Sequence, residues 1–360
     1  MPQTKYGVIS DLHIDPRIII PTIKILKQKG AAKLLVNGDI GGHYGSLENS
    51  QQYTAAILNE IGKSGLESFV QPGSHETILG YDPVINHFSV KYPNIIDALK
   101  NSKMQNPDHH LVFLPGSDFL CDGEYQIGHD QKIPSGKYII LEDKLIPMST
   151  LDQYVVMLSD ETTREKIKGA MQYTNMNVLK KLVTQPEKTI VVCHVPRKFD
   201  NPQTGVDMAH FYESRVYQRG KKEYISRGVF PAVAFDKRIA RQNNTLVYSK
   251  EQSDEHINAD IKEKLYRAGC DAATILVERK ENRGNENLRQ LYTELEITKA
   301  VSGHFHESSH QAHDSKGIPV AQNTLTENLF WNSGHLDAGH CGILTVEKNK
   351  VSYENVIIQK

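Results

Sequence analysis

Two short pairs of side chains have the types and spacing that could bind a cation. Asp11 and His13 directly follow one apolar run, and His304 and His306 directly follow another. Residues two apart in an extended chain point to the same side, so both members of a pair can reach one ion. Either pair alone would more often be a capped loop or a surface histidine. Together the two pairs predict a metal site.

Two further residues could complete that site. Asp39 follows Gly38, which permits close backbone approach, and a carboxylate there can bridge two cations by giving one oxygen to each. The alternative is an aspartate that caps the next helix. His194 emerges from the apolar run at 190–193, and its alternative role is a core histidine bonded to a backbone carbonyl. Its position at a strand end favours a ligand.

The elements that position these residues can be read from the hydrophobic pattern. Helical spacing at 18–29 and about 51–62 separates short apolar strands, so the chain begins as a βαβ unit. Five strands are predicted to end in a polar residue of interest, at 6–10, 33–36, 68–70, 189–193 and 298–302. Because open α/β sheets bind ligands at the carboxyl ends of their strands, we expect these five ends to converge.

The long connections predict one domain, 1–360, with an insertion. Residues 106–146 indicate short strands and turns, and a long helical region is predicted around 152–183. The polar stretch 197–281, with a helix near 254–268, is predicted to be an inserted cap or substrate-binding segment after His194. The tail predicts strands at 318–321, 341–346 and 351–358.

Composition excludes several classes. The 360 residues are 39% hydrophobic and 24% charged, which is ordinary for a globular protein, and the net charge of −1 gives no global attraction to nucleic acid or an anionic membrane. No apolar run is long enough for a signal peptide or a membrane span, so we expect a cytoplasmic protein. The four cysteines are far apart, which predicts free thiols: Cys121, Cys193, Cys270 and Cys341.

The motifs in order resemble those of the calcineurin-like metallophosphoesterase superfamily. The matching elements are Asp11-x-His13, Gly38-Asp39, Gly73-Ser74-His75-Glu76, His194 and Gly303-His304-Phe305-His306. The resemblance covers 5–100 and 186–346. It implies a four-layer α/β/β/α sandwich with two metal ions at the carboxyl ends of the strands.

Carried over by position, the resemblance implies a ligand set for each metal. Asp11, His13 and His306 would hold the first ion, His194 and His304 the second, and Asp39 would bridge them. Mixed nitrogen and oxygen ligands suit Mn, Fe or Zn better than Ca. A hydroxide between two cations about 3.5–4 Å apart would attack the phosphate ester in line. His75 would stabilise the phosphoryl charge or protonate the leaving oxygen.

The sequence departs from the family pattern at Ser74, where the family usually has an asparagine ligand to the second metal. A serine hydroxyl is a shorter and poorer ligand. Three outcomes remain open: water fills the gap and the second metal binds more weakly, the site works differently, or it is catalytically dead. Asp15 and His43 are given no ligand role. The other histidines are expected to be solvated or core residues, with the last four near the rim: His109, His110, His310, His313, His335 and His340.

The substrate is less defined than the chemistry. Basic and aromatic residues alternate within 215–241, which suits a nucleotide, although a solvated helix face with buried aromatics explains the same pattern. The chain lacks the arginine that phosphoprotein phosphatases carry soon after the Gly38-Asp39 element. We therefore expect a phosphodiesterase or phosphomonoesterase acting on a small or nucleotide-like phosphate ester. The alternatives are a DNA or RNA nuclease and a catalytically impaired binding protein; the retention of His75 argues against the latter.

Overall fold

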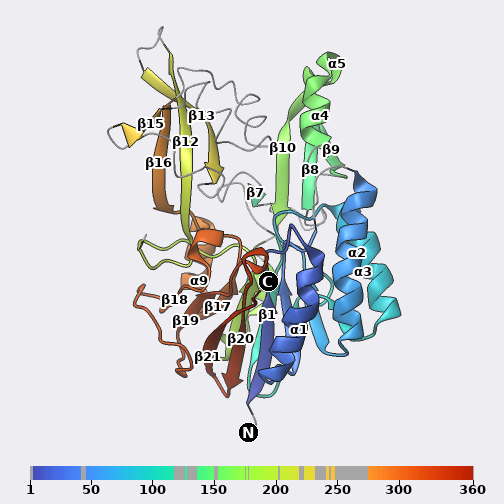
Figure 1. Ribbon diagram of the computed structural model, residues 1–360, viewed down its shortest axis with the longest axis vertical. Coiled ribbons are helices and arrows are strands. Elements are labelled where there is room, and N and C mark those ends of the chain that lie inside the picture. Colours follow the sequence, from blue (N-terminus) through green and yellow to red (C-terminus); the bar gives the residue numbers. More distant parts are fainter. Residues whose placement is uncertain are drawn as a thin grey trace. The chain divides into compact units, whose positions relative to one another are not determined.

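A computed structural model shows a mixed α/β protein with parallel and antiparallel sheets (Figure 1). It describes residues 3–41, 46–116, 126–127, 136–149, 153–174, 176, 178–201, 203–218, 223–231, 241–242, 245–247 and 275–359. The chain divides into two compact units, Met1–Asp207 with Arg283–Lys360, and Met208–Asn282. The second unit overlaps the predicted insertion at 197–281; that this segment caps a site stays a prediction. In the part of the chain described, no helix is both long and apolar enough to cross a membrane.

The first six-stranded sheet contains the amino-terminal βαβ units. Its order is β21-β20-β1-β2-β3-β4, with β1 to β4 parallel and the last two strands of the chain joined to β1 by antiparallel pairing. These strands are almost continuously buried, as expected for parallel strands covered on both faces. The strands are β1 (Thr4–Ile9), β2 (Lys33–Asn37), β3 (Glu67–Gln71), β4 (Ile95–Asp97), β20 (His340–Glu347) and β21 (Lys350–Ile357).

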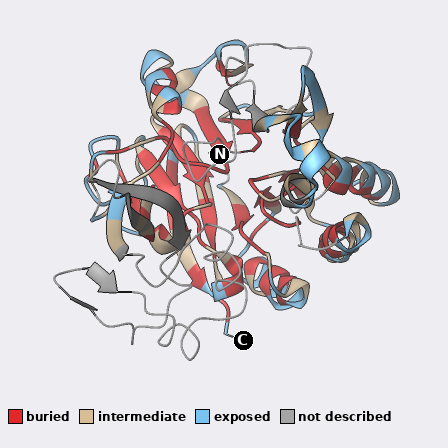
Figure 2. Ribbon diagram, turned by 90° about the horizontal axis from the view of Figure 1, so that it is seen from above, coloured by how far each residue is buried: buried red, intermediate tan, exposed pale blue. Residues whose placement is uncertain are grey.

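Three amphipathic helices pack against this sheet: α1 (Ile19–Gln28), α2 (Leu47–Lys63) and α3 (Ile78–Lys91). The amino ends of the last two are set by local capping, since Ser46 accepts a hydrogen bond from the N–H of Asn49 and Thr77 accepts one from Gly80. Figure 2 shows that the helices carry one buried and one exposed side. The buried side forms a core cluster with the sheet.

The second six-stranded sheet has the order β18-β19-β17-β11-β6-β5, and its four central strands are parallel. A second core cluster draws buried residues from both six-stranded sheets, including Phe69, Phe113 and Trp331. A third cluster joins the second sheet to α6 (Val178–Leu182) and α9 (Glu286–Glu294). The strands are β5 (Lys103–Gln105), β6 (His110–Leu114), β11 (Thr189–Cys193), β17 (Lys299–Ser302), β18 (Ala312–His313) and β19 (Leu329–Asn332).

Two smaller sheets complete the described strands. One, in the first unit, has the order β7-β10-β8-β9, and the other, in the second unit, has the order β13-β12-β16-β15-β14. Their strands are β7 (Gln126–Ile127), β8 (Gly136–Leu141), β9 (Lys144–Pro147), β10 (Ile167–Thr174), β12 (Met208–Gln218), β13 (Glu223–Pro231), β14 (Arg241–Gln242), β15 (Thr245–Val247) and β16 (Ile275–Asn282). The remaining short elements are α4 (Gln153–Ser159), α5 (Glu161–Arg164), η1 (Pro16–Ile18), η2 (Pro186–Lys188), η4 (His306–Ser308) and η5 (Leu336–Ala338).

Two predicted elements are wrong. The helical region at 152–183 is interrupted by β10, because pairing with β8 across the sheet outweighs helical spacing. The strand at 318–321 is absent, because the Asp314 carboxylate accepts the N–H groups of Lys316 and Ile318 and folds the segment into a turn. The predicted helix near 254–268 lies outside the described residues.

Candidate metal centre

The loops after five strands bring the predicted site residues together. Asp11 follows β1, Asp39 follows β2, His75 follows β3, His194 follows β11, and the two histidines of the 304–306 pair follow β17. Three groups each have ligand atoms within 4.8 Å of one another: Asp11 with His13 and His306, Asp39 with His13 and His75, and Asp39 with His194 and His304. Each group could hold a metal ion.

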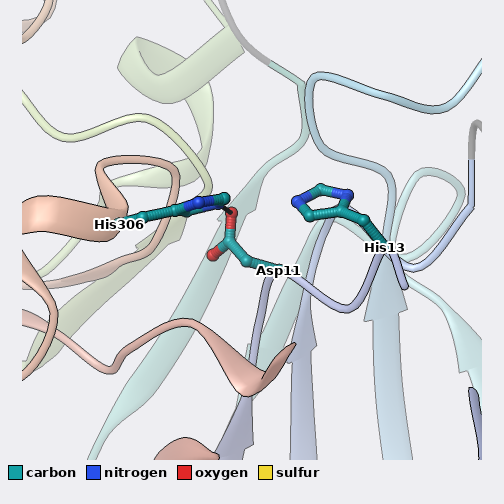
Figure 3. A group of neighbouring side chains, drawn as sticks. All are labelled: Asp11, His13 and His306. Atoms are coloured by element: carbon teal, nitrogen blue, oxygen red, sulfur yellow. Dashed lines mark hydrogen bonds and ion pairs between the residues drawn. The ribbon is translucent and has the colours of Figure 1, made fainter. Parts of the chain in front are cut away.

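The first group is centred on the Asp11 carboxylate (Figure 3). Nε2 of His306 lies 3.3 Å from Asp11 Oδ1, and the rings of His13 and His306 are 5.4 Å apart. Both ring nitrogens of His13 are buried without a hydrogen-bond partner. Burial, with the neighbouring His75, lowers the pKa of His13 to about 3, so the ring is neutral and offers a lone pair.

The group of Asp39, His194 and His304 places His194 against two carboxylates. Its Nδ1 donates a hydrogen bond of 2.7 Å to the carbonyl of Asn37, which directs Nε2 toward Asp39 Oδ2 at 3.0 Å and Asp11 Oδ1 at 3.9 Å. Such a bond fixes the tautomer in which Nε2 can bind a metal. Burial alone would lower the pKa of His194, but Asp39 and Asp11 raise it to about 10. The ring beside these carboxylates is therefore protonated at neutral pH, and a bound cation would displace the Nε2 proton. The His304 ring packs edge-on against His194, with centroids 5.3 Å apart.

Asp39 belongs to two of the three groups. Its Oδ1 accepts the backbone N–H of His75 at 2.8 Å, and its Oδ2 accepts the Ser74 hydroxyl at 2.9 Å. Burial would raise the pKa of Asp39, but His194 and His75 hold it well below its ordinary value, so it is a carboxylate. Nε2 of His75 lies 3.9 Å from Oδ2. Ser74 therefore lies beside Asp39 with its hydroxyl proton directed at the carboxylate, and its role as a metal ligand stays a prediction.

Three of the predicted ligands have left-handed backbone conformations. The φ angles are 57° at Asp11, 56° at Asp39 and 67° at His304. Such residues persist only where the surrounding structure fixes them, and they cluster at functional sites. The N–H of Leu12 donates to the carbonyl of Asp39 at 2.7 Å, and a Cβ on Gly38 would lie 2.6 Å from the Cα of Gly73. The bare glycine backbones thus allow neighbouring strand-end loops to touch.

Sequence reasoning missed two carboxylates that hold these loops. Glu76 is buried and accepts the N–H groups of Asp39 at 3.2 Å, Ile40 at 2.5 Å and Gly73 at 2.7 Å. The position of Glu76 in the motif Gly73-Ser74-His75-Glu76 was the sequence signal that could have identified it. Asp337 accepts the N–H of His13 at 2.6 Å from a distant part of the sequence, and no sequence signal marks it.

The remaining histidines have structural roles or lie at the rim. His109 is a core residue whose Nε2 is 2.6 Å from the hydroxyl of Tyr6, and His313 accepts the N–H of Val206 at 3.1 Å. His335 stacks on His306 with ring centroids 3.6 Å apart. His110 is buried, and the rings of His310 and His340 stack on each other. Cys193 and Cys341 are buried thiols, as the sequence predicts, and Arg215 pairs with Glu213. Three residues named in the sequence analysis lie outside the described residues: His43, Cys121 and Cys270.

The donor set fits a divalent cation. Carboxylates and imidazoles meet there, the His13 imidazole has two buried nitrogens without hydrogen-bond partners, and the His194 ring is oriented by the Asn37 carbonyl so that Nε2 faces the carboxylates.

Comparisons with known proteins add no family assignment. No protein-family model matches the chain, and no curated protein matches it. Among solved structures, TT1561 of Thermus thermophilus is 9% identical with a TM-score of 0.47, over 98% of this chain and 99% of that one. GAP50, described as the anchor in the inner membrane complex of Plasmodium, is 10% identical with a TM-score of 0.36, over 100% of this chain and 90% of that one. Likenesses at this level carry no argument about fold or function.

Proposed function

We propose that this protein is a metal-dependent phosphoesterase. The observation that carries the proposal is the placement of Asp39, whose ionised carboxylate is shared by two groups of potential ligands. When two cations share one carboxylate ligand, each cation also needs ligands of its own, and here histidines from both groups could supply them. The resemblance of the ordered motifs to the calcineurin-like superfamily supports the same reading.

The two ligand sets follow from the contacts. Asp11, His13 and His306 would hold one ion, and His194 and His304 would hold the other, with Asp39 between them and Ser74 nearby. Two such ions, of Mn, Fe or Zn, would supply a hydroxide nucleophile and positive charge for the phosphoryl oxygens.

The protein's own side chains would position the reaction. The Asn37 carbonyl holds His194 in place, and Asp337 fixes the backbone of His13. The His75 side chain is 26% exposed beside Asp39, so it can meet a bound ester from the solvent side. There its Nε2 would donate a proton or hydrogen bond to the leaving or phosphoryl oxygen.

The proposal includes the finer fold. The three core clusters support a four-layer α/β/β/α sandwich. The first cluster joins helices to the first sheet, the second joins the two six-stranded sheets, and the third joins the second sheet to helices. The substrate we propose is a small or nucleotide-like phosphodiester or phosphomonoester. The nuclease alternative gains nothing from Arg215, whose guanidinium is paired with Glu213 at 2.7 Å.

One observation favours an impaired binding protein as the second candidate. The Ser74 hydroxyl donates its proton to Asp39, where the family's asparagine would offer a carbonyl oxygen to the second metal. A weak second metal would leave a fold that binds phosphate esters without turnover.

The test is hydrolysis of bis-p-nitrophenyl phosphate and p-nitrophenyl phosphate by metal-stripped protein resupplied with Mn, Fe, Zn or Mg. Asp39→Asn and His75→Ala are assayed beside Asp15→Asn, a matched control at a partly exposed carboxylate paired with Arg17. We expect activity to return with metal, to survive in the control, and to be lost in the first two variants. The ratio of diester to monoester hydrolysis then chooses the substrate class. No turnover with any metal, in folded protein that binds metal, would favour the binding protein.

A further inference from the structure

A cavity of about 240 Å³ lies in the first unit. Its walls come from the segment that leads out of β11, from helix α9, and from the turn that precedes Ile318. The lining residues are Arg197, Lys198, Phe199, Asp200, Asn201, Arg289, Ser315, Lys316 and Gly317. None of them belongs to the three ligand groups described above.

The charge of this cavity is strongly one-sided. Four cationic side chains line it, and Asp200 is its one acidic residue. Asp200 pairs with Arg289 at 2.8 Å, and its side chain is 75% exposed. This carboxylate can neutralise one cation, so the lining keeps an excess of positive charge. An excess of this kind in a concave site concentrates anions.

Arg197 is the buried member of the four. It is 9% exposed, and its guanidinium carbon lies 4.0 Å from the ring centroid of Phe199 and 4.6 Å from that of Phe330. Its Nη2 donates to the carbonyl of Ser315 at 3.1 Å, but its Nε is buried without a hydrogen-bond partner. Among the described residues, no carboxylate forms an ion pair with it.

In the described part of the chain, Arg197 has no carboxylate in direct contact, although Asp207 and Asp200 act on its charge from a greater distance. Arginine stays protonated in proteins, and a buried charge is unfavourable unless it is paired and hydrogen-bonded. Cation–π contacts with two rings offset only part of that cost. The planar guanidinium presents donors in a fork that matches phosphate and carboxylate oxygens. An oxyanion in the cavity would supply a direct partner of this kind.

We propose that this cavity binds a small phosphate-type oxyanion, held by Arg197 and the exposed cations around it. Sites for drug-sized ligands have volumes of roughly 300–1,000 Å³, so the smaller cavity suits inorganic phosphate or a single phosphoryl group. The proposal does not rest on the phosphoesterase function. A bound oxyanion would tie together three chain segments, the one at 197–201, helix α9 and the turn at 315–317.

The test is calorimetric titration of the full-length, metal-stripped protein with inorganic phosphate. Arg289→Gln with Lys316→Gln removes two partly exposed cations, and loss of a charged hydrogen bond at each is expected to weaken binding about tenfold or more. Asp200→Asn removes the competing carboxylate and is expected to tighten binding. The matched control is Glu294→Gln, which changes another exposed carboxylate, one paired with Lys180 outside the cavity. It is expected to leave the affinity unchanged.

Two further arms separate this site from its alternatives. His304→Ala disables the proposed metal centre, and phosphate binding that survives in it belongs elsewhere. Adenosine monophosphate is titrated in place of phosphate. Binding would show that the cavity accepts a phosphoryl group attached to an organic molecule, and no binding would show that it accepts only the free phosphate ion. The proposal is overturned if the parent protein does not bind phosphate with a Kd below roughly 10 mM. It is also overturned if the Arg289→Gln, Lys316→Gln double variant and the Asp200→Asn variant both bind phosphate with the affinity of the parent. Arg197→Met is a supplementary variant, and a failure of that variant to fold leaves these criteria intact.

Discussion

Glu76 joins the loops that follow β2 and β3, so replacing it with glutamine is expected to loosen both. The carboxylate accepts three backbone N–H groups, from Asp39, Ile40 and Gly73, and all its described backbone partners are donors. A glutamine side chain keeps one oxygen in place of two. If that oxygen stays where Oε2 is, the bonds from Asp39 and Gly73 survive and the Ile40 N–H faces an amide group that also donates.

The magnitude follows from this one lost bond. A hydrogen bond to a charged acceptor contributes about 1.5–3 kcal/mol, and a buried donor left without a partner costs about 1–3 kcal/mol. Because the two figures describe the same lost contact, they are not added, and we expect Glu76→Gln to lower the free energy of unfolding by at most about 3 kcal/mol. Burial and Asp39 raise the pKa of Glu76 to about 7, so at pH 8 the fold disfavours the ionised side chain, and the neutral amide offsets part of this loss.

Urea unfolding followed by circular dichroism measures this difference. The matched control is Glu67→Gln, which removes the charge of a 43% exposed side chain paired with Lys33 and is expected to cost less than about 1 kcal/mol. A Glu76→Gln protein as stable as the parent, or more stable, would refute the reasoning, because the bond from the Ile40 N–H would then contribute no more than burial of the charge costs.

Three further predictions concern the site and its rim. Asp39→Asn is expected to remove at least one bound metal per chain, since Asp39 is shared by two ligand groups; elemental analysis after dialysis measures this, and unchanged stoichiometry would contradict it. Ser74→Asn is expected to tighten the weaker metal about tenfold, or about 1.4 kcal/mol, by calorimetry, whereas Ser74→Ala should not; equal affinities would contradict a ligand role for this position. Burial and His340 lower the pKa of His310 to about 4, whereas the same side chain in the unfolded chain has a pKa near 6.5. Between these two values only the unfolded chain binds the proton, so the free energy of unfolding falls as the pH drops from 6.5 to 4. His310→Gln is expected to flatten this part of the stability profile, and a parallel profile would contradict the assignment.

The positions of the site residues could be predicted because strand ends are marked locally. The runs before Asp11, Asp39 and His194 are short, apolar and followed by polar residues, and the structure confirms β1, β2 and β11 there. Parallel strands share one edge for their carboxyl ends, so convergence followed from topology. The ligand distances could not be predicted, because they depend on left-handed turns that the sequence does not mark.

Long-range partners were beyond sequence reasoning. Asp337 supports His13, and the pairing of β10 with β8 decides a segment whose spacing favoured helix. The strand predicted at 318–321 is absent for a different reason, because the Asp314 carboxylate accepts the nearby N–H groups of Lys316 and Ile318 and forms a turn. The first two features depend on contacts between residues that are distant in the sequence, whereas the third depends on a local side-chain contact.

The left-handed turns at Asp11, Asp39 and His304 have a consequence for how the protein would handle its ions. Each turn lies at a strand end, and backbone hydrogen bonds such as Leu12 N–H to the carbonyl of Asp39 link the turns to one another. Because protein groups supply these constraints, we expect the ligand loops to form before a cation binds. We expect the protein to stay folded when a chelator removes its ions, so that one divalent metal can be exchanged for another. The metal that is bound would then depend on the concentration of each metal in the surroundings and on the fixed spacing of the ligands.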